Sequence, residues 1–194
     1  MIQENYMKQP DLSYWQFRPE SQYLDRKSAR KKPSELLKHL IAFANADGGQ
    51  LVIGVEDEKQ GNIITGFKEA RAYPIDDFKK IDREMRETPL DLSFEEIPVV
   101  NHKGEDDLIL IISVELSSNR VIAAPNDDVY LRQGDESIKL SYEQRTQLSY
   151  AFLKMRLFWM RPWKILTKIS YRISKVTLIY QSAPRRKFLR QGDS

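Results

Sequence analysis

The clearest change in the pattern of apolar and polar positions occurs between residues 33 and 55. Pro33 suits the first turn of a helix, where its missing N–H needs no partner, and apolar residues then recur at helical spacing. These residues are Leu36, Leu37, Leu40, Ile41 and Ala44. Gly48 and Gly49 follow, and glycine readily takes the left-handed conformation that ends a helix. The next segment, QLVIGV at 50–55, is a continuous apolar run, so we predict a helix, a turn and a strand covered on both faces.

Strand-like and helical patterns alternate through the rest of the first 150 residues. Strands are predicted at GNIITGF (61–67), LSFEEIPVV (92–100), LILIISVEL (108–116) and DVYLRQ (128–133). The first of them should pair with the strand at 50–55 across a charged turn. Helices are predicted at 75–87 and, with Ser141 as its cap, at 141–148. This mixed order without an internal repeat predicts an α/β or α+β fold in which helices flank a mixed sheet.

Composition narrows the class of protein and the kind of site. The chain has 194 residues, of which 41% are hydrophobic and 30% charged, as expected for a globular protein with one main core. It has no cysteine, and its only histidines are His39 and His102. We therefore expect neither zinc nor haem, and any metal would need oxygen ligands. The N-terminal residues lack the pattern of a signal peptide, and no run of about 18 apolar residues predicts a membrane span, so we expect a cytoplasmic protein.

Charge divides the chain into two unequal parts. Residues 1–149 carry 20 Lys and Arg against 27 Asp and Glu, a balance of −7, whereas residues 151–194 carry 11 Lys and Arg against Asp193 alone, a balance of +10. We predict a domain at 1–149 and a basic, aromatic C-terminal extension at 150–194. The extension could bind nucleic acid or an anionic membrane surface. Alternatively it is a packed terminal segment, or a segment foreign to the ancestral domain.

Two groups of side chains could carry chemistry, and the first is acidic. Glu20, Asp25, Glu56 and Asp57 could converge if the segment 20–27 pairs beside the strand at 50–55. Such a group would hold Mg²⁺ or Mn²⁺ in an oxygen shell. The alternative is that these acids are solvated turn residues. ATP is not expected, because a P-loop places its glycines before a helix, whereas here they follow one.

The second group is the basic run RKSARKK at 26–32. Its cationic residues are Arg26, Lys27, Arg30, Lys31 and Lys32. Such a segment could bind several phosphates of a nucleic acid, with an affinity that falls as salt rises, or it could be an ordinary solvated loop. Cations that hold a polyanion, beside acids that hold a metal, are the two parts that a nuclease needs.

Four segments in this order resemble the Schlafen AlbA_2 domain family: ESQYLDRK (20–27), LLKHLIAFANADGGQLVIGVED (36–57), GNIITGF (61–67) and VYLRQGDES (129–137). The resemblance covers about residues 17–148. It implies a DNA-binding domain of the kind found in bacterial transcription-regulator-like proteins and in animal Schlafens.

Some Schlafens cleave tRNA and rRNA, and the resemblance to them further implies a metal-dependent endonuclease centre in this chain. Its catalytic residues would be Glu20, Asp25, Lys27 and Glu56 or Asp57. Asp25 departs from the pattern, since the family more often has Glu there, and Arg26 stands where an aromatic residue is common. The shorter side chain withdraws its oxygens, and metal sites are sensitive to such displacements.

Three functional hypotheses follow. The leading one is a module that binds the backbone of DNA or RNA through the basic run at 26–32, with or without the extension. The second is an endoribonuclease that acts on structured RNA through the carboxylates and Mg²⁺ or Mn²⁺. The third is a protein-interaction module that forms a homodimer or larger oligomer through the aromatic extension. Arg132 could bind phosphate or pair internally with an acid, and Asn45 and Asp47 are expected to cap and turn the chain.

Overall fold

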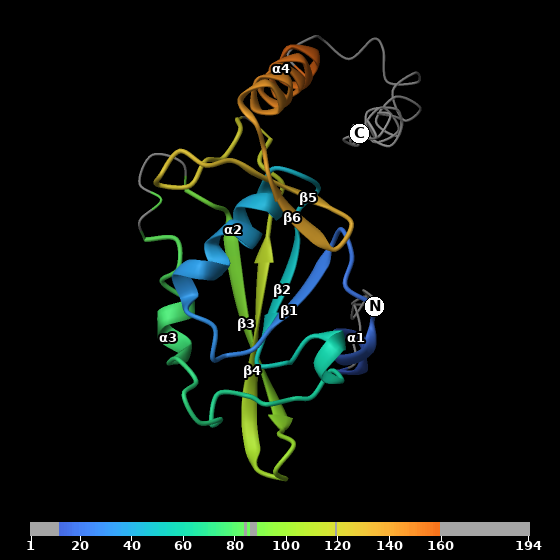
Figure 1. Ribbon diagram of the computed structural model, residues 1–194, viewed down its shortest axis with the longest axis vertical. Helices are drawn as coiled ribbons and strands as arrows, with labels where there is room; N and C mark the ends of the chain where they lie inside the picture. The colour runs from blue at the N-terminus through green and yellow to red at the C-terminus, as the bar shows by residue number, and fades with distance from the viewer. Residues whose placement is uncertain (1–11, 84, 86–88, 119, 160–194) are drawn as a thin grey trace, which may run out of the picture. The chain divides into compact units, whose positions relative to one another are not determined.

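Residues 12–83, 85, 89–118 and 120–159 are described by the computed structural model of this chain (Figure 1). The chain divides into two units, Met1–Arg156 and Leu157–Ser194. All the side-chain contacts given below lie in the first unit. Of the extension expected at 150–194, residues 160–194 lie outside the described part of the chain.

Four strands form a mixed sheet in the order β1-β2-β4-β3. Their bounds are β1 Leu24–Lys27, β2 Gly49–Ile53, β3 Leu92–Val100 and β4 Asp106–Val114. β1 and β2 run parallel, and α2 (Pro33–Ala44) makes the crossover that a parallel pair needs. β4 is antiparallel to both of its neighbours, β2 and β3. The predicted fold class, helices flanking a mixed sheet, is confirmed.

Cover on both faces of the sheet explains the continuous apolar run in β2. Leu51 and Ile53 belong to the larger core, which includes α2, whereas Val52 belongs to a smaller core with Trp15 of α1 (Leu12–Phe17). Leu51, Val52 and Ile53 are fully buried. Figure 1 shows α2 in front of the sheet in this view. Because each face has its own cover, both alternate sets of β2 side chains are apolar at its three buried positions.

A two-stranded hairpin of β5 (Tyr130–Gln133) and β6 (Glu136–Lys139) packs against α2. The buried side chain of Asn45, at the end of α2, fixes this arrangement. Its amide donates to the carbonyls of Ile122 (2.8 Å) and Tyr130 (2.9 Å), and its own carbonyl accepts from the N–H of Ile122 (2.7 Å). Asn45 therefore connects the end of α2 to the strand that carries Arg132.

The two glycines after α2 are required for different reasons. Gly48 has a φ of +73°, and its N–H donates to the carbonyl of Phe43 (3.0 Å), as predicted for a residue that ends a helix. Gly49 already belongs to β2, and a Cβ there would lie 2.5 Å from the ring of Phe43. The first glycine thus serves the turn, and the second allows α2 to pack closely on the sheet.

The segment GNIITGF does not form the predicted strand. Gly61, Asn62 and Gly66 all have positive φ angles (82°, 55° and 66°), which interrupt an extended backbone. Only an isolated bridge, Val55 with Ile64, remains of the pairing expected between this segment and the strand at 50–55. The sequence pattern was apolar enough for a strand, but positive φ angles at two glycines and an asparagine interrupt the extended backbone.

The remaining helices differ from the prediction in length. Within the segment expected at 75–87, α3 comprises only Ile75–Phe78. α4 (Tyr142–Trp159) is longer than predicted and begins with a capping box, because Ser141 Oγ accepts from the N–H of Gln144 (3.3 Å) and Gln144 Oε1 accepts from the N–H of Ser141 (2.8 Å). A turn of 3-10 helix, η1, lies at Glu58–Gln60. Among the described helices, none combines the length and the apolar character needed to cross a bilayer.

Candidate nucleic-acid interface

Alternation along β1 separates its polar side chains onto the two faces of the sheet. Asp25 and Lys27 point to the face that α2 covers, and Leu24 and Arg26 point to the face with Trp15. Parallel pairing puts Asp25 opposite Leu51 and Lys27 opposite Ile53, both in the larger core. A carboxylate therefore stands at the edge of an apolar core, with a side-chain exposure of only 2%.

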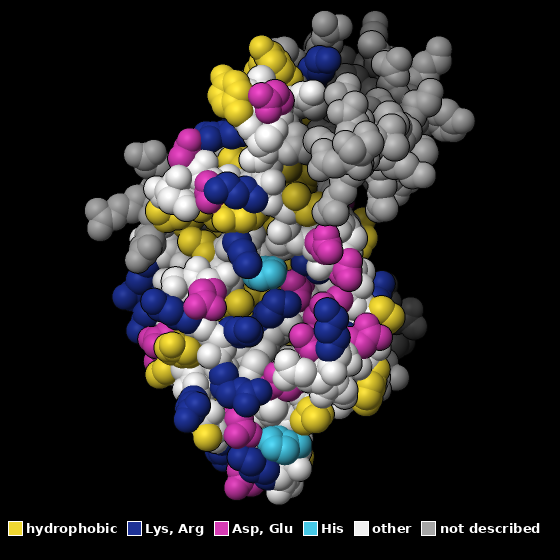
Figure 2. Space-filling view, viewed as in Figure 1, with side chains coloured by type: hydrophobic (Ala, Val, Ile, Leu, Met, Phe, Trp, Pro, Cys, Tyr) yellow, Lys and Arg dark blue, Asp and Glu magenta, His cyan; other side chains and the backbone are white. Residues whose placement is uncertain are grey.

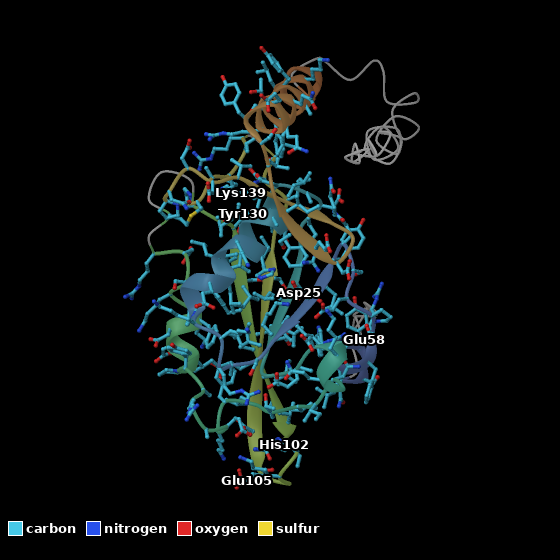
Figure 3. The ribbon with its side chains drawn as sticks, in the orientation of Figure 1. Asp25, Glu58, His102, Glu105, Tyr130 and Lys139 are labelled. Atoms are coloured by element: carbon cyan, nitrogen blue, oxygen red, sulfur yellow. The ribbon has the colours of Figure 1, made fainter. Side chains whose placement is uncertain are left out.

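Three basic side chains enclose the buried carboxylate of Asp25. Asp25 is labelled in Figure 3. Arg132 Nη1 donates to Oδ2 (2.9 Å), His39 Nδ1 lies 3.1 Å from the same oxygen, and Lys27 Nζ pairs with Oδ1. These four residues, Asp25, Lys27, His39 and Arg132, form the ion-pair centre. It joins β1, α2 and β5, three segments that are distant in sequence.

Arg132 has no exposed side-chain surface, and every nitrogen of its guanidinium is hydrogen-bonded. Besides Asp25, it donates to the carbonyls of Ser21 (3.1 and 2.9 Å) and Leu24 (3.2 Å) and to Ser137 Oγ (3.3 Å). Its guanidinium carbon lies 4.8 Å from the centroid of the Phe43 ring. Of the two roles left open for Arg132, the structure shows the internal pair with an acid.

Burial and charge set the pKa values in the ion-pair centre. Burial raises the pKa of Asp25, but the hydrogen bond from His39 and the charge of Lys27 outweigh it and hold this pKa well below its usual range. Burial lowers the pKa of His39 below its ordinary value, and the hydrogen bond to Asp25 opposes this only in part. Burial, and then the charge of Asp25, raise the pKa of Glu20. At neutral pH, Asp25 is ionised and His39 is a neutral donor to it.

The lowered pKa of His39 predicts that stability falls as pH falls below about 6.5, the ordinary value for histidine. In that range the unfolded chain takes up a proton that the folded chain resists, so the free energy of unfolding decreases toward acid. His39→Gln keeps a donor for Asp25 and removes the titration. Urea unfolding at several pH values should therefore show a wild-type slope steeper than that of the variant, by up to about 1.4 kcal/mol per pH unit. Equal slopes would contradict this assignment.

The four carboxylates do not converge on one point as expected for a metal site. Glu20 Oε1 accepts from the N–H of Arg26 (3.0 Å), and the buried Glu56 binds Arg30 Nη2 (2.7 Å) and Thr65 (3.3 Å). Asp57 accepts from the N–H of Gln60 (3.1 Å) at the start of η1. No group of three or more acids and histidines among the described residues could hold a metal ion.

Because cations occupy both oxygens of Asp25, the described arrangement does not fit Mg²⁺ or Mn²⁺ bound by this carboxylate. Lys27, expected to stabilise a phosphate, points its ammonium group at Asp25 and at the carbonyl of Arg26 (2.9 Å). Asp25 and Lys27 therefore act first on the protein itself. Glu20 lies close enough to Asp25 for their charges to interact, but Glu56 and Asp57 are held by other partners.

The basic run at 26–32 divides into buried and exposed residues. Arg26 is fully buried, and its Nη1 donates to the carbonyls of Trp15 (3.0 Å) and Arg18 (2.6 Å), so it does not face solvent. Arg30, Lys31 and Lys32 are exposed on the loop between β1 and α2. This basic loop, residues 28–32, is the part of the run that a ligand can reach. Figure 2 shows dark blue Lys and Arg side chains beside a cyan histidine on the face seen in this view.

Hydrogen bonds within the basic loop and to a neighbouring segment hold its backbone. The N–H and Nε of Arg30 both donate to Ser28 Oγ (3.3 and 3.1 Å), and the N–H of Lys31 donates to the Ser28 carbonyl (3.0 Å). Ala29 is fully buried, and its carbonyl accepts from the N–H of Tyr73 (2.9 Å). The exposed cations therefore project from an ordered loop, which reduces the entropy that is lost when a ligand binds.

Three polar residues of the site were not predicted from the sequence. His39 and Ser137 complete the hydrogen bonds around Asp25 and Arg132, and Lys38 adds an exposed cation on α2. Helical spacing could have indicated that Lys38 is exposed, because Lys38 falls on the polar face of the predicted helix. Nothing in the sequence indicated that Ser137 would meet His39, 98 positions away, at 3.1 Å.

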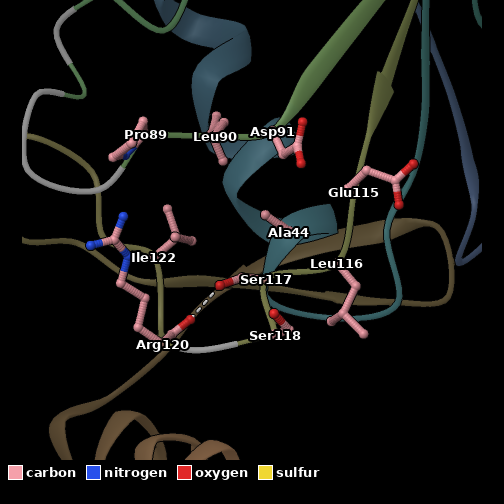
Figure 4. A pocket seen from close by; sticks show the side chains of 10 residues that line it. All are labelled: Ala44, Pro89, Leu90, Asp91, Glu115, Leu116, Ser117, Ser118, Arg120 and Ile122. Atoms are coloured by element: carbon pink, nitrogen blue, oxygen red, sulfur yellow. Dashed lines mark hydrogen bonds between the residues drawn. The ribbon is translucent and has the colours of Figure 1, made fainter.

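A cavity of about 330 Å³ lies at the other end of α2, away from the basic loop (Figure 4). Its lining includes Ala44, Ile122, Arg120 and the carboxylates of Asp91 and Glu115. Ser117 Oγ donates to the carbonyl of Arg120 there (2.6 Å). Two carboxylates against one arginine make this cavity a poor site for a polyanion.

Comparison with known proteins gives the family. The family model described as "Schlafen, AlbA_2" matches residues 20–141, and the chain belongs to this family. Among solved structures, the crystal structure of the DIP2311 protein from Corynebacterium diphtheriae is similar at 18% identity with a TM-score of 0.46. The match covers 67% of this chain and 28% of that one. No curated protein matches the chain significantly.

Proposed function

We propose that this chain is a cytoplasmic nucleic-acid-binding module, of the kind found in bacterial transcription-regulator-like proteins, and that the basic loop binds backbone phosphates. The observation that carries the proposal is the group of three exposed cations, Arg30, Lys31 and Lys32, on a loop held by hydrogen bonds. Lys31 and Lys32 form no ion pair with any described residue, so binding a phosphate breaks no existing pair. Family membership supports the same class of ligand.

The geometry of Arg30 is consistent with phosphate binding. Its Nη2 pairs with Glu56 (2.7 Å) and its Nε with Ser28 (3.1 Å), whereas Nη1 has no hydrogen-bond partner among the described residues. Its side chain is 45% exposed. Glu56 therefore orients the guanidinium and leaves one edge for a phosphate oxygen. Contacts of this kind position a nucleic acid without selecting its sequence.

In this proposal, three of the candidate carboxylates, Glu20, Asp25 and Glu56, organise the binding surface. Asp25 connects β1, α2 and β5, and its bonds hold the strand from which the basic loop emerges. Glu20 accepts from the backbone of β1, and Glu56 orients Arg30. This assignment explains why Asp25 and Glu56 pair with cations and Glu20 with a backbone N–H, rather than all three facing a common point.

The experiment is a binding titration with fluorescently labelled DNA and RNA, in the presence of Mn²⁺ and, separately, of EDTA. We expect binding of both nucleic acids that weakens with salt, persists in EDTA and leaves the labelled strand intact. Absence of binding at low salt would overturn the proposal. Cleavage that needs Mn²⁺ and is lost in Glu20→Gln would show instead that the carboxylates form an endonuclease centre. Glu20→Gln is preferred to a change at Asp25, because it leaves the ion-pair centre intact.

A further inference from the structure

Next to the basic loop lies an exposed aromatic residue with no evident structural role. The N–H of Tyr73 donates to the carbonyl of Ala29 (2.9 Å), which places the two backbones side by side. Tyr73 is 37% exposed, and its side chain makes no hydrogen bond or aromatic ring contact with a described residue. Its neighbours Ala72 and Ile75 pack against the larger core, but Tyr73 does not. Pro74 is also exposed, so two exposed residues with apolar rings, Tyr73 and Pro74, lie next to the basic loop.

An arginine with an unusual backbone conformation lies two residues before this tyrosine. Arg71 is exposed and has a φ of +65°, a conformation that costs a non-glycine residue about 1–2 kcal/mol. Arg71 lies in a turn that is closed by a hydrogen bond from the N–H of Ala72 to the carbonyl of Glu69 (3.0 Å). Glu69 itself pairs with Lys103 (3.1 Å), and Arg71 forms no ion pair with a described residue. Arg71 thus adds a free cation on the chain that borders the basic loop.

Acidic residues limit this surface on one side. Asp76 and Asp77 are exposed in the first turn of α3, directly after Pro74. Their charge disfavours a polyanion at the start of α3, whereas the cations of the basic loop favour one. Figure 2 shows a yellow apolar patch over α3, with dark blue and magenta side chains beside it. Tyr73 therefore lies in the chain between an exposed cation, Arg71, and these acids, with its backbone bonded to the basic loop.

We propose that Tyr73 stacks on an unpaired base of a single-stranded nucleic acid whose phosphates bind Arg30, Lys31 and Arg71. The proposal deepens the function given above and rests on it. A cationic surface combined with an exposed aromatic ring is what proteins use to bind single strands, because every base presents a face for stacking. In a duplex the bases are already stacked on each other, so a ring at this position gains little from them. The protein should therefore bind a single strand more tightly than a duplex of the same length.

The test separates stacking from phosphate binding with three labelled probes of equal length: a single-stranded oligonucleotide, the same backbone without bases, and the duplex. Tyr73→Ala should weaken binding of the base-bearing single strand by about 5- to 150-fold, the range expected for loss of one stacked base. It should leave binding of the abasic strand and of the duplex unchanged. Tyr73→Phe should restore wild-type binding. Arg71→Ala should weaken the base-bearing and the abasic strand equally.

A matched control is Tyr142→Ala, which removes a tyrosine that is 79% exposed at the start of α4. It should change none of the three affinities. If Tyr73→Ala binds all probes like the wild type, or weakens the base-bearing and abasic strands alike, stacking is refuted although phosphate binding stands. If the wild-type protein binds none of the probes, the proposed function fails together with this inference.

Discussion

Replacing Arg132 by methionine is expected to lower the free energy of unfolding by about 3–5 kcal/mol, as for removal of one partner of a buried ion pair. Methionine fills similar space but removes both guanidinium donors to the carbonyl of Ser21. The carbonyl of Leu24 loses its bond from Arg132 and keeps the one from the N–H of Ser21. It also leaves the buried Asp25 with only Lys27 and His39 to offset its charge. Urea unfolding of the wild type and the variant measures the difference directly.

The matched control is Arg145→Met. Arg145 also binds a carboxylate, that of Asp127 at 2.6 Å, but the two side chains are 36% and 75% exposed. Exposed ion pairs contribute little, so this variant should lose less than about 1 kcal/mol. Similar losses in the two variants would contradict the structural role assigned to Arg132.

A double-mutant cycle with Asp25→Asn isolates the pair itself. Because Arg132 and Asp25 share a hydrogen bond of 2.9 Å, their variants should be non-additive by about 0.5–3 kcal/mol. The cycle also distinguishes the two roles that the sequence left open for Arg132. If Arg132 bound phosphate instead, its substitution would lower the affinity for nucleic acid and leave the free energy of unfolding unchanged. The two substitutions would then have additive effects on stability.

Local signals predicted the segment 33–55 well. Helical spacing, a glycine that must adopt a positive φ and a continuous apolar run all lie within a few residues of each other, so short-range physics determines the result. The same reasoning failed at 61–67, where Gly61, Asn62 and Gly66 turn a strand-like pattern into a loop. Glycine and asparagine inside an apolar run favour a turn, so their presence argued against a strand at 61–67.

The basic run shows what a charge pattern cannot reveal. Arg26 and Lys27 are adjacent in sequence but lie on opposite faces of β1, and Arg26 is fully buried. Recognising LDRK as a strand would have predicted this, because Leu24 and Arg26 then share a face. The strand is only four residues long and mostly polar, so its own sequence gives little strand signal. Its parallel pairing with β2 stabilises it instead.

The ion-pair centre could be predicted only in part. The acids and Arg132 were identified as chemically important, but their partners depend on how α2 and β5 pack on β1. Asp25 and Arg132 are 107 positions apart, and His39 reaches them from the helix between β1 and β2. No spacing rule encodes contacts over such separations. Acidic residues at the positions that the family pattern marks can therefore form either a metal site or a buried ion pair, and the sequence alone does not distinguish the two.

Substituting Arg30, Lys31 and Lys32 together with glutamine is expected to reduce the salt dependence of single-strand binding. Each phosphate contact adds about 0.7 to the slope of log affinity against log salt, so losing three should lower the slope by about 2. Between about 50 and 200 mM salt, the wild type would then lose about 20-fold more affinity than the variant. Glutamine at 30 keeps a donor for Glu56, which limits the effect on the fold.

A variant with the same change in net charge makes this test specific. Lys59, Lys103 and Lys139 are exposed outside the basic loop, and their joint replacement by glutamine also removes three positive charges. If the basic loop holds the phosphates, this control keeps the wild-type slope, because counterion release depends on cations in contact with the backbone rather than on net charge. Equal slopes in the two triple variants would mean that the nucleic acid responds to overall charge and that the basic loop is not its binding site.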